Sequence, residues 1–118
     1  CNRFERYIAV SDGDIGEVLD ALQRHTEANE AFQKSMAGFR RLAFRNDTDA
    51  YAQWDLAVSQ QKYSIHLYNT GSPEDAVKSH RKISRMLEEM IQSRQMVGEA
   101  TSLFERIKLE IEAFQAER

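Results

Sequence analysis

The single proline of this chain restricts its fold more than any other feature. Pro73 stands in the segment Asn69-Thr70-Gly71-Ser72-Pro73. Loop-rich proteins and β-proteins form their turns with proline and glycine, so one proline in 118 residues argues against both classes. The many Ala, Gln, Glu, Arg and Leu residues lose little free energy on entering a helix. The sequence therefore predicts an all-α fold.

The segment around Pro73 also predicts one sharp boundary. Gly71 suits the positive φ that ends many helices. Ser72 can cap the next helix, Pro73 fits its first position, and Glu74 and Asp75 place acidic groups in its first turn. We expect a tip over residues 70–73 between two antiparallel helices.

Apolar residues recur at spacings of three and four on both sides of this tip, as on one face of a helix. This pattern predicts a helix over 12–69 and a second over 74–117, the second about 65 Å long. Residues 1–10 are expected to be the end of a preceding helix or a linker. The residues assigned to the packing or dimer seam are Phe32, Met36, Phe39, Trp54, Phe104, Ile107, Ile111 and Phe114.

The apolar stripe changes phase by about one residue across Asn46-Asp47-Thr48-Asp49. A kink there would keep a long hairpin of two helices, and a break would give a three-helix, spectrin-like bundle. The hairpin leaves much apolar surface uncovered in a monomer, so we expect a homo- or heterodimer with another helical hairpin. The residues that would need such cover are Phe4, Tyr7, Phe39, Phe44, Phe104 and Phe114.

Charge and cysteine content exclude several classes. The net charge is −3, with no basic excess, so no nucleic-acid partner is expected. One cysteine cannot build a disulfide framework. The chain also lacks the run of about 18 apolar residues that a membrane-spanning helix requires. Cys1 has two interpretations, the lipidated cysteine of a bacterial lipoprotein or a fragment boundary. The helical pattern of Phe4, Tyr7 and Ile8 favours the boundary.

Catalytic and metal-binding patterns are weak. His25, His66 and His80 form neither Glu-x-x-His nor His-x-x-x-His pairs, and no glycine-rich phosphate loop occurs. We therefore expect no enzymatic activity, no metal and no cofactor.

Two basic clusters are the candidate binding sites. In a hairpin that turns at Gly71, Lys62 comes level with His80 and joins the basic residues that follow the tip. Such residues either solvate a helix or contact anionic lipid headgroups, each contributing about 1 kcal/mol near such a surface. The first cluster is Lys62, Lys78, Arg81, Lys82 and Arg85, and the second is Arg40, Arg41 and Arg45.

Three segments resemble the BAR domain of sorting nexins. Phe104-Glu105-Arg106-Ile107, then Glu110, Phe114 and Glu117-Arg118, is similar to the last helix of that domain. Ala31-Phe32, Met36 and Phe39-Arg40-Arg41-Leu42 resemble part of the helix before it, and Asn69–Pro73 matches its hairpin tip.

The resemblance implies a BAR-type antiparallel coiled coil that dimerises on anionic membranes. It implies a cytoplasmic protein, peripheral on endosomal membranes, that senses or imposes curvature in endosomal sorting. The alternative function is a helical protein–protein interaction or scaffold bundle that does not bind membranes.

Overall fold

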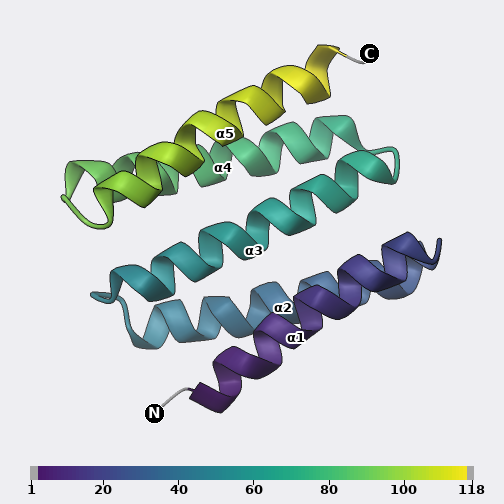
Figure 1. Cartoon of the computed structure of the whole chain (residues 1–118), viewed down its shortest axis with the longest axis horizontal. Coiled ribbons are helices and arrows are strands. Elements are labelled where there is room, and N and C mark those ends of the chain that lie inside the picture. Colours follow the sequence, from purple (N-terminus) through teal and green to yellow (C-terminus); the bar gives the residue numbers. More distant parts are fainter. Residues whose placement is uncertain (1–2, 117–118) are drawn as a thin grey trace. The chain divides into compact units, whose positions relative to one another are not determined.

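A computed structural model describes residues 3–116, and every regular element among them is a helix. In chain order the helices are α1 (Arg3–Ala21), α2 (His25–Arg45), α3 (Ala50–Asn69), α4 (Pro73–Gln92) and α5 (Val97–Ala116) (Figure 1). The predicted all-α class is confirmed. Cys1, with its two interpretations, and the Glu117-Arg118 pair lie outside the described residues.

The helices expected over 12–69 and 74–117 contain two breaks that the sequence did not predict, at 22–24 and 93–96, and one at 46–49 that it left open. The expected tip is confirmed, since α3 ends at Asn69 and α4 begins at Pro73. Residues 3–10 form the first turns of α1 rather than the end of an earlier helix.

The missed breaks use the same turn geometry as the predicted tip. Each turn has a residue with a positive φ at the same place: Gln23 (63°), Gly71 (94°) and Arg94 (58°). The next backbone N–H then donates to a carbonyl five residues back, the Schellman arrangement. These bonds run from Arg24 to Leu19 (2.8 Å), from Ser72 to Leu67 (2.8 Å) and from Gln95 to Met90 (2.9 Å). The turn at 93–96 has a second residue with a positive φ, Met96 (48°). Gln23 and Arg94 are not glycines, so neither turn could be predicted from the sequence.

At 46–49 the helix is interrupted, as in the alternative with a break at this position, and not merely kinked. Asn46 bends its side-chain amide back to donate to the Leu42 carbonyl at 2.8 Å. Asp49 then caps α3, because its carboxylate accepts the backbone N–H of Tyr51 at 2.9 Å. Polar side chains satisfy both helix ends here.

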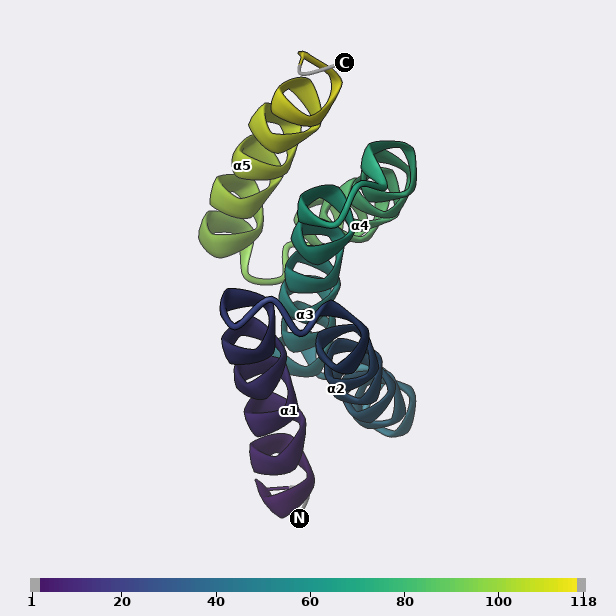
Figure 2. The ribbon, with the colours of Figure 1, turned by 90° about the vertical axis from the view of Figure 1, so that its right-hand side faces the viewer.

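The chain divides into two compact units, residues 1–63 and 64–118, and α3 contributes to both. In the first unit α1 and α2 pack against each other closely (Figure 2). Ser35 Oγ donates to the Ala9 carbonyl at 2.6 Å. A Cβ added at Gly16 would lie 3.0 Å from the Phe32 ring, so glycine is what permits this approach.

The second unit joins the end of α3 to α4 and α5. Ser64 Oγ donates to Ser79 Oγ at 2.6 Å, which fixes the antiparallel pairing around the tip. Tyr68 stacks on Phe114, with ring centroids 4.4 Å apart. Phe114 packs with Ala76 at the centre of a buried cluster.

A shift of 48 residues superposes the helices on one another in sequence. Ile8-Ala9-Val10-Ser11 in α1 becomes Leu56-Ala57-Val58-Ser59 in α3, and Gln23 becomes Gly71. The same positions of α2 and α4 are buried: Ala28 and Ala76, Phe32 and His80, Ser35 and Ile83, Phe39 and Leu87, Leu42 and Met90. The chain thus carries an internal repeat of one helical hairpin, which is the pattern of helical-repeat proteins.

Candidate interaction surface

The largest exposed apolar stripe within the described residues runs along α1. Its five members follow the spacing of one helix face, and we call them the α1 face. Their exposed fractions are 80% for Phe4, 62% for Ile8, 50% for Ile15, 58% for Val18 and 60% for Leu22. A contiguous apolar stripe of this kind marks an interaction site more often than a solvated surface.

The 48-residue register shows what this face corresponds to elsewhere in the chain. The equivalents of Phe4, Ile8, Ile15 and Val18 in α3 and α5 are buried or half-buried, whereas these four residues are exposed. Leu22, just past the end of α1, corresponds to Thr70, which is also exposed. In α3 they are Ala52, Leu56, Tyr63 and His66, and in α5 they are Ala100, Phe104, Ile111 and Phe114. The same face is therefore covered in two helices and open in the third.

In α3 this face is covered by the preceding helix, α2. Leu56 packs against the cluster that contains Phe39 and Leu42 of α2. The Gln53 side chain donates to the Ala43 carbonyl at 3.2 Å, nearer the turn at 46–49. Farther from that turn, Gln33 Nε2 donates to Tyr63 Oη at 3.4 Å. The two helices therefore run antiparallel along their length.

In α5 the same face is covered by α4. Phe114 packs against Ala76 and Val77 of α4. His80 Nε2 lies 2.8 Å from Glu110 Oε1, and the His80 ring is 4.9 Å from that of Phe114. Each of these faces is thus covered by the helix that comes before it in the chain.

The side of α1 that packs against α2 consists of small residues. The corresponding side of α5 differs from it in composition. Ala9, Gly13 and Gly16 of α1 correspond to Glu105, Leu109 and Glu112 of α5. All three α5 side chains are exposed, and two of them are acidic. This side of α5 is therefore acidic at two of its three positions, and its one apolar residue, Leu109, is exposed.

The predicted cluster of Arg40, Arg41 and Arg45 lines a shallow pocket between α1 and α2. Glu5 and Phe44 complete it, and Phe44 is the most exposed large apolar residue of the described chain, at 85%. Arg45 donates a hydrogen bond to the Glu5 carboxylate. That bond, with the charges of Arg45 and Arg41, lowers the pKa of Glu5 below its ordinary value.

The other predicted cluster is divided between the two units. Lys78, Arg81, Lys82 and Arg85 are exposed on α4, and within residues 3–116 none of them pairs with a carboxylate. Lys62 instead lies 2.9 Å from Glu17 and 3.6 Å from Asp14. Its charge is therefore compensated within the first unit.

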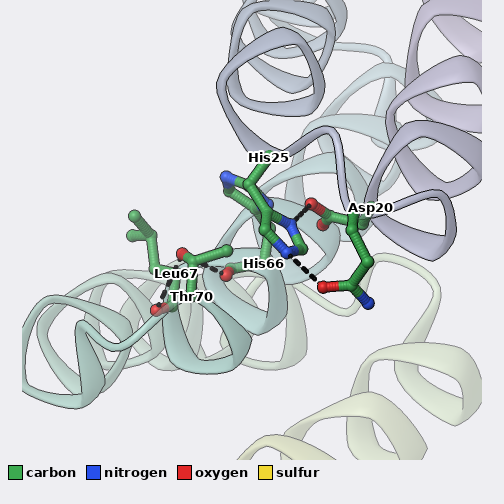
Figure 3. Close-up of polar contacts among 6 residues, drawn as sticks. Asp20, His25, His66, Leu67 and Thr70 are labelled. Carbon is green, nitrogen blue, oxygen red and sulfur yellow. Dashed lines mark hydrogen bonds and ion pairs between the residues drawn. The ribbon is translucent and has the colours of Figure 1, made fainter.

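The three histidines have structural partners. His25 Nδ1 lies 2.8 Å from Asp20 Oδ1, and its Nε2 lies 3.1 Å from Gln23 Oε1, which ties the turn at 22–24 together (Figure 3). The His66 carbonyl accepts a bond from Thr70 Oγ1 at 2.8 Å at the end of α3. Within residues 3–116 no cluster of three or more His, Cys, Asp or Glu side chains is placed to bind a metal ion.

No helix in the described range has the length and apolar character needed to cross a membrane.

The predicted seam residues pack inside the chain's own units. Phe32, Phe39, Ile107 and Phe114 are buried, and Met36, Trp54, Phe104 and Ile111 are half-buried. Their burial within one chain removes the reason to assign them to a dimer seam. The expectation of six uncovered aromatic residues holds for three of them: Phe4, Tyr7 and Phe44 are exposed. It is wrong for Phe39 and Phe114, which are buried, and Phe104 is half-buried. Dimerisation itself stays a prediction.

Comparison with protein-family models, with curated proteins and with solved structures finds no match to this chain. The α1 face was the main feature that sequence reasoning missed. Ile8, Ile15 and Leu22 were visible as apolar helix positions, but nothing in their spacing distinguishes a covered face from an open one. The recurrence of Ile8–Ser11 as Leu56–Ser59 is the signal that would have revealed the repeat.

Proposed function

We propose that this chain is a non-catalytic helical-repeat module that binds another protein through the α1 face. One observation carries the proposal: the equivalent faces of α3 and α5 are covered by a helix, and that of α1 is not. A face with this spacing, exposed within residues 3–116, suits recognition of a protein segment. This is the scaffold alternative that the sequence had left open.

The membrane-curvature hypothesis has less support. It depended on two continuous helices of BAR type, whereas the helices here are 19 to 21 residues long and separated by tight turns. The α1 face also lacks a basic border along most of its length, since residues 8–22 include four acidic residues and no lysine or arginine. No lysine or arginine within residues 8–22 would attract anionic lipid.

A site-specific photo-crosslinker tests the proposal in the cells from which the protein comes. Benzoylphenylalanine at Ile15 places the reactive group within the α1 face, and the same group at the exposed Leu109 of α5 is the matched control. We expect covalent protein adducts from position 15 and none from position 109. Equal adducts at both positions, lipid adducts alone, or none would contradict a protein-binding α1 face.

The exposed basic side of α4 favours a second candidate, contact with an anionic membrane surface. Lys78, Lys82 and Arg85 project from one side of α4 without carboxylate partners in the described part of the chain. Liposome co-sedimentation at low salt tests this function. It requires preferential pelleting with anionic vesicles and its loss when these three residues are reversed to glutamate. Equal recovery with neutral and anionic vesicles would contradict it.

A further inference from the structure

We propose that the pocket beside the carboxyl-terminal half of α2 binds an acidic peptide segment with an aromatic side chain next to its carboxylates. We call this pocket the α2 pocket. Its lining residues are Glu5, Ala37, Arg40, Arg41, Phe44 and Arg45. It contains no residue of the α1 face, so the inference goes beyond the proposed function and does not depend on it.

The α2 pocket carries positive charge that the chain does not compensate. Three arginines and one glutamate line it, which leaves a net charge of +2. Arg45 donates to the Glu5 carboxylate. Within residues 3–116 neither Arg40 nor Arg41 pairs with a carboxylate. The planar guanidinium group matches the geometry of a carboxylate, so two such groups remain for the carboxylates of a partner.

Phe44 supplies the apolar part of the site. It is exposed to solvent, and Arg40 and Arg41 lie four and three residues before it on the same side of the helix. An aromatic ring of the partner can pack against Phe44. Guanidinium groups also stack on aromatic rings. The pocket therefore favours an aromatic side chain that has acidic neighbours.

The second hairpin shows that the fold does not require this composition. At the corresponding positions of α4 the charge is reversed, and an amide replaces the aromatic ring. The pairs are Arg40 and Glu88, Arg41 and Glu89, and Phe44 and Gln92. All six side chains are exposed. The stripe is thus open in a hairpin that follows another hairpin as well as in the first, so its exposure does not depend on what precedes α1.

Two observations favour a peptide over an anionic membrane as the occupant. The site is a pocket with a volume of about 800 Å³, within the range of clefts that hold discrete ligands. Asp47 and Asp49 are exposed within four residues of Arg45. These carboxylates reduce the attraction of this end of α2 for an anionic bilayer, whereas a peptide confined to the pocket need not approach them.

The test titrates the full chain into a rhodamine-labelled peptide, Ser-Glu-Asp-Phe-Glu-Asp-Ser, and follows fluorescence anisotropy. We expect saturable binding that Arg40→Glu combined with Arg41→Glu weakens at least tenfold, and that Phe44→Ser weakens several-fold. The matched control is Arg106→Glu combined with Lys108→Glu, which makes the same change in net charge at exposed positions of α5. At about 100 mM salt, where charges more than about 10 Å apart are largely screened, this control should change the affinity less than twofold.

The substituted side chains are all exposed, and circular dichroism verifies that each variant is folded. Peptide variants test both halves of the chemistry. Replacing the acidic residues of the peptide by their amides is expected to weaken binding at least tenfold, and replacing its phenylalanine by serine is expected to weaken it several-fold.

Three results would overturn the inference. The first is the absence of saturable peptide binding. The second is an equal loss of affinity in the α2 and α5 charge variants, or binding that Phe44→Ser leaves unchanged. The third is binding of phosphatidylserine vesicles that requires Arg40 and Arg41 while the peptide does not bind, because the occupant would then be a membrane.

Discussion

Replacing Gly16 by alanine tests the close packing of α1 on α2, which sets how the hairpin is built. The new Cβ would lie 3.0 Å from three atoms of the Phe32 ring, and that ring is 3% exposed. Overpacking of this kind costs about 1–3 kcal/mol. Alanine in place of glycine within a helix gains about 1 kcal/mol, so the contact and the helix preference oppose each other.

Gly98→Ala separates the two effects. Gly98 also lies in a helix, but an added Cβ there meets nothing within 4 Å. Both substitutions replace a helical glycine by alanine, so both gain much the same helix preference. Gly16→Ala should therefore be less stable than Gly98→Ala by the overpacking cost alone, about 1–3 kcal/mol. The corresponding difference in Tm is roughly 2–8 °C.

Urea unfolding followed by circular dichroism at 222 nm measures this difference. Trp54 is the single tryptophan and lies in the first unit with Gly16, so its fluorescence reports that unit directly. We expect the Trp54 transition to move to lower urea in Gly16→Ala and to remain in place in Gly98→Ala. Equal stability of the two variants would refute the close-approach argument for α1 and α2.

The turns and the Glu5 pair give further predictions. Gly71→Ala should lower the free energy of unfolding by about 1 kcal/mol, because a φ of 94° is strained for alanine. Arg94→Gly should raise it by roughly 0.5–1 kcal/mol, because the φ of Arg94, 58°, favours glycine. Thermal unfolding by circular dichroism measures both, and equal effects in the two variants would contradict the turn assignment. Arg45→Ala should raise the pKa of Glu5 toward its ordinary value, measured by NMR titration of the carboxyl group. Since the folded pKa of Glu5 is lowered, its contribution to stability is present above the unfolded pKa and is lost as pH falls through the folded pKa. An unchanged Glu5 titration in Arg45→Ala would contradict the pairing.

The sequence predicted the helical class and one turn because their signals are local. Gly71 and Pro73 specify the tip by backbone chemistry alone: a positive φ for the glycine and a helix start for the proline. Gln23 and Arg94 adopt the same left-handed conformation without a glycine. At 22–24 the His25 side chain bonds to Asp20 and Gln23, a combination that no familiar turn pattern predicts.

The candidate site shows the same limit. The spacing of Ile8, Ile15 and Leu22 established an apolar helix face, but exposure depends on which helix covers that face. Phe39 and Phe114 looked like candidates for a dimer seam and proved to be buried within the chain. The basic residues of α4 were expected in water and are exposed there, whereas Lys62 was placed in that cluster by a pairing rule that ignored α1.

A distance measurement across the turn at 93–96 tests most directly that the chain folds back in successive hairpins. Spin labels at Lys82→Cys and Lys108→Cys, in a Cys1→Ser background, occupy exposed positions on α4 and α5. The bond between His80 and Glu110 brackets the same pair, so we expect a separation below about 20 Å, because packed helix axes lie about 8–10 Å apart. One continuous helix would place these residues about 39 Å apart. A distribution centred there would contradict the hairpin and the repeat register through which the α1 face is recognised.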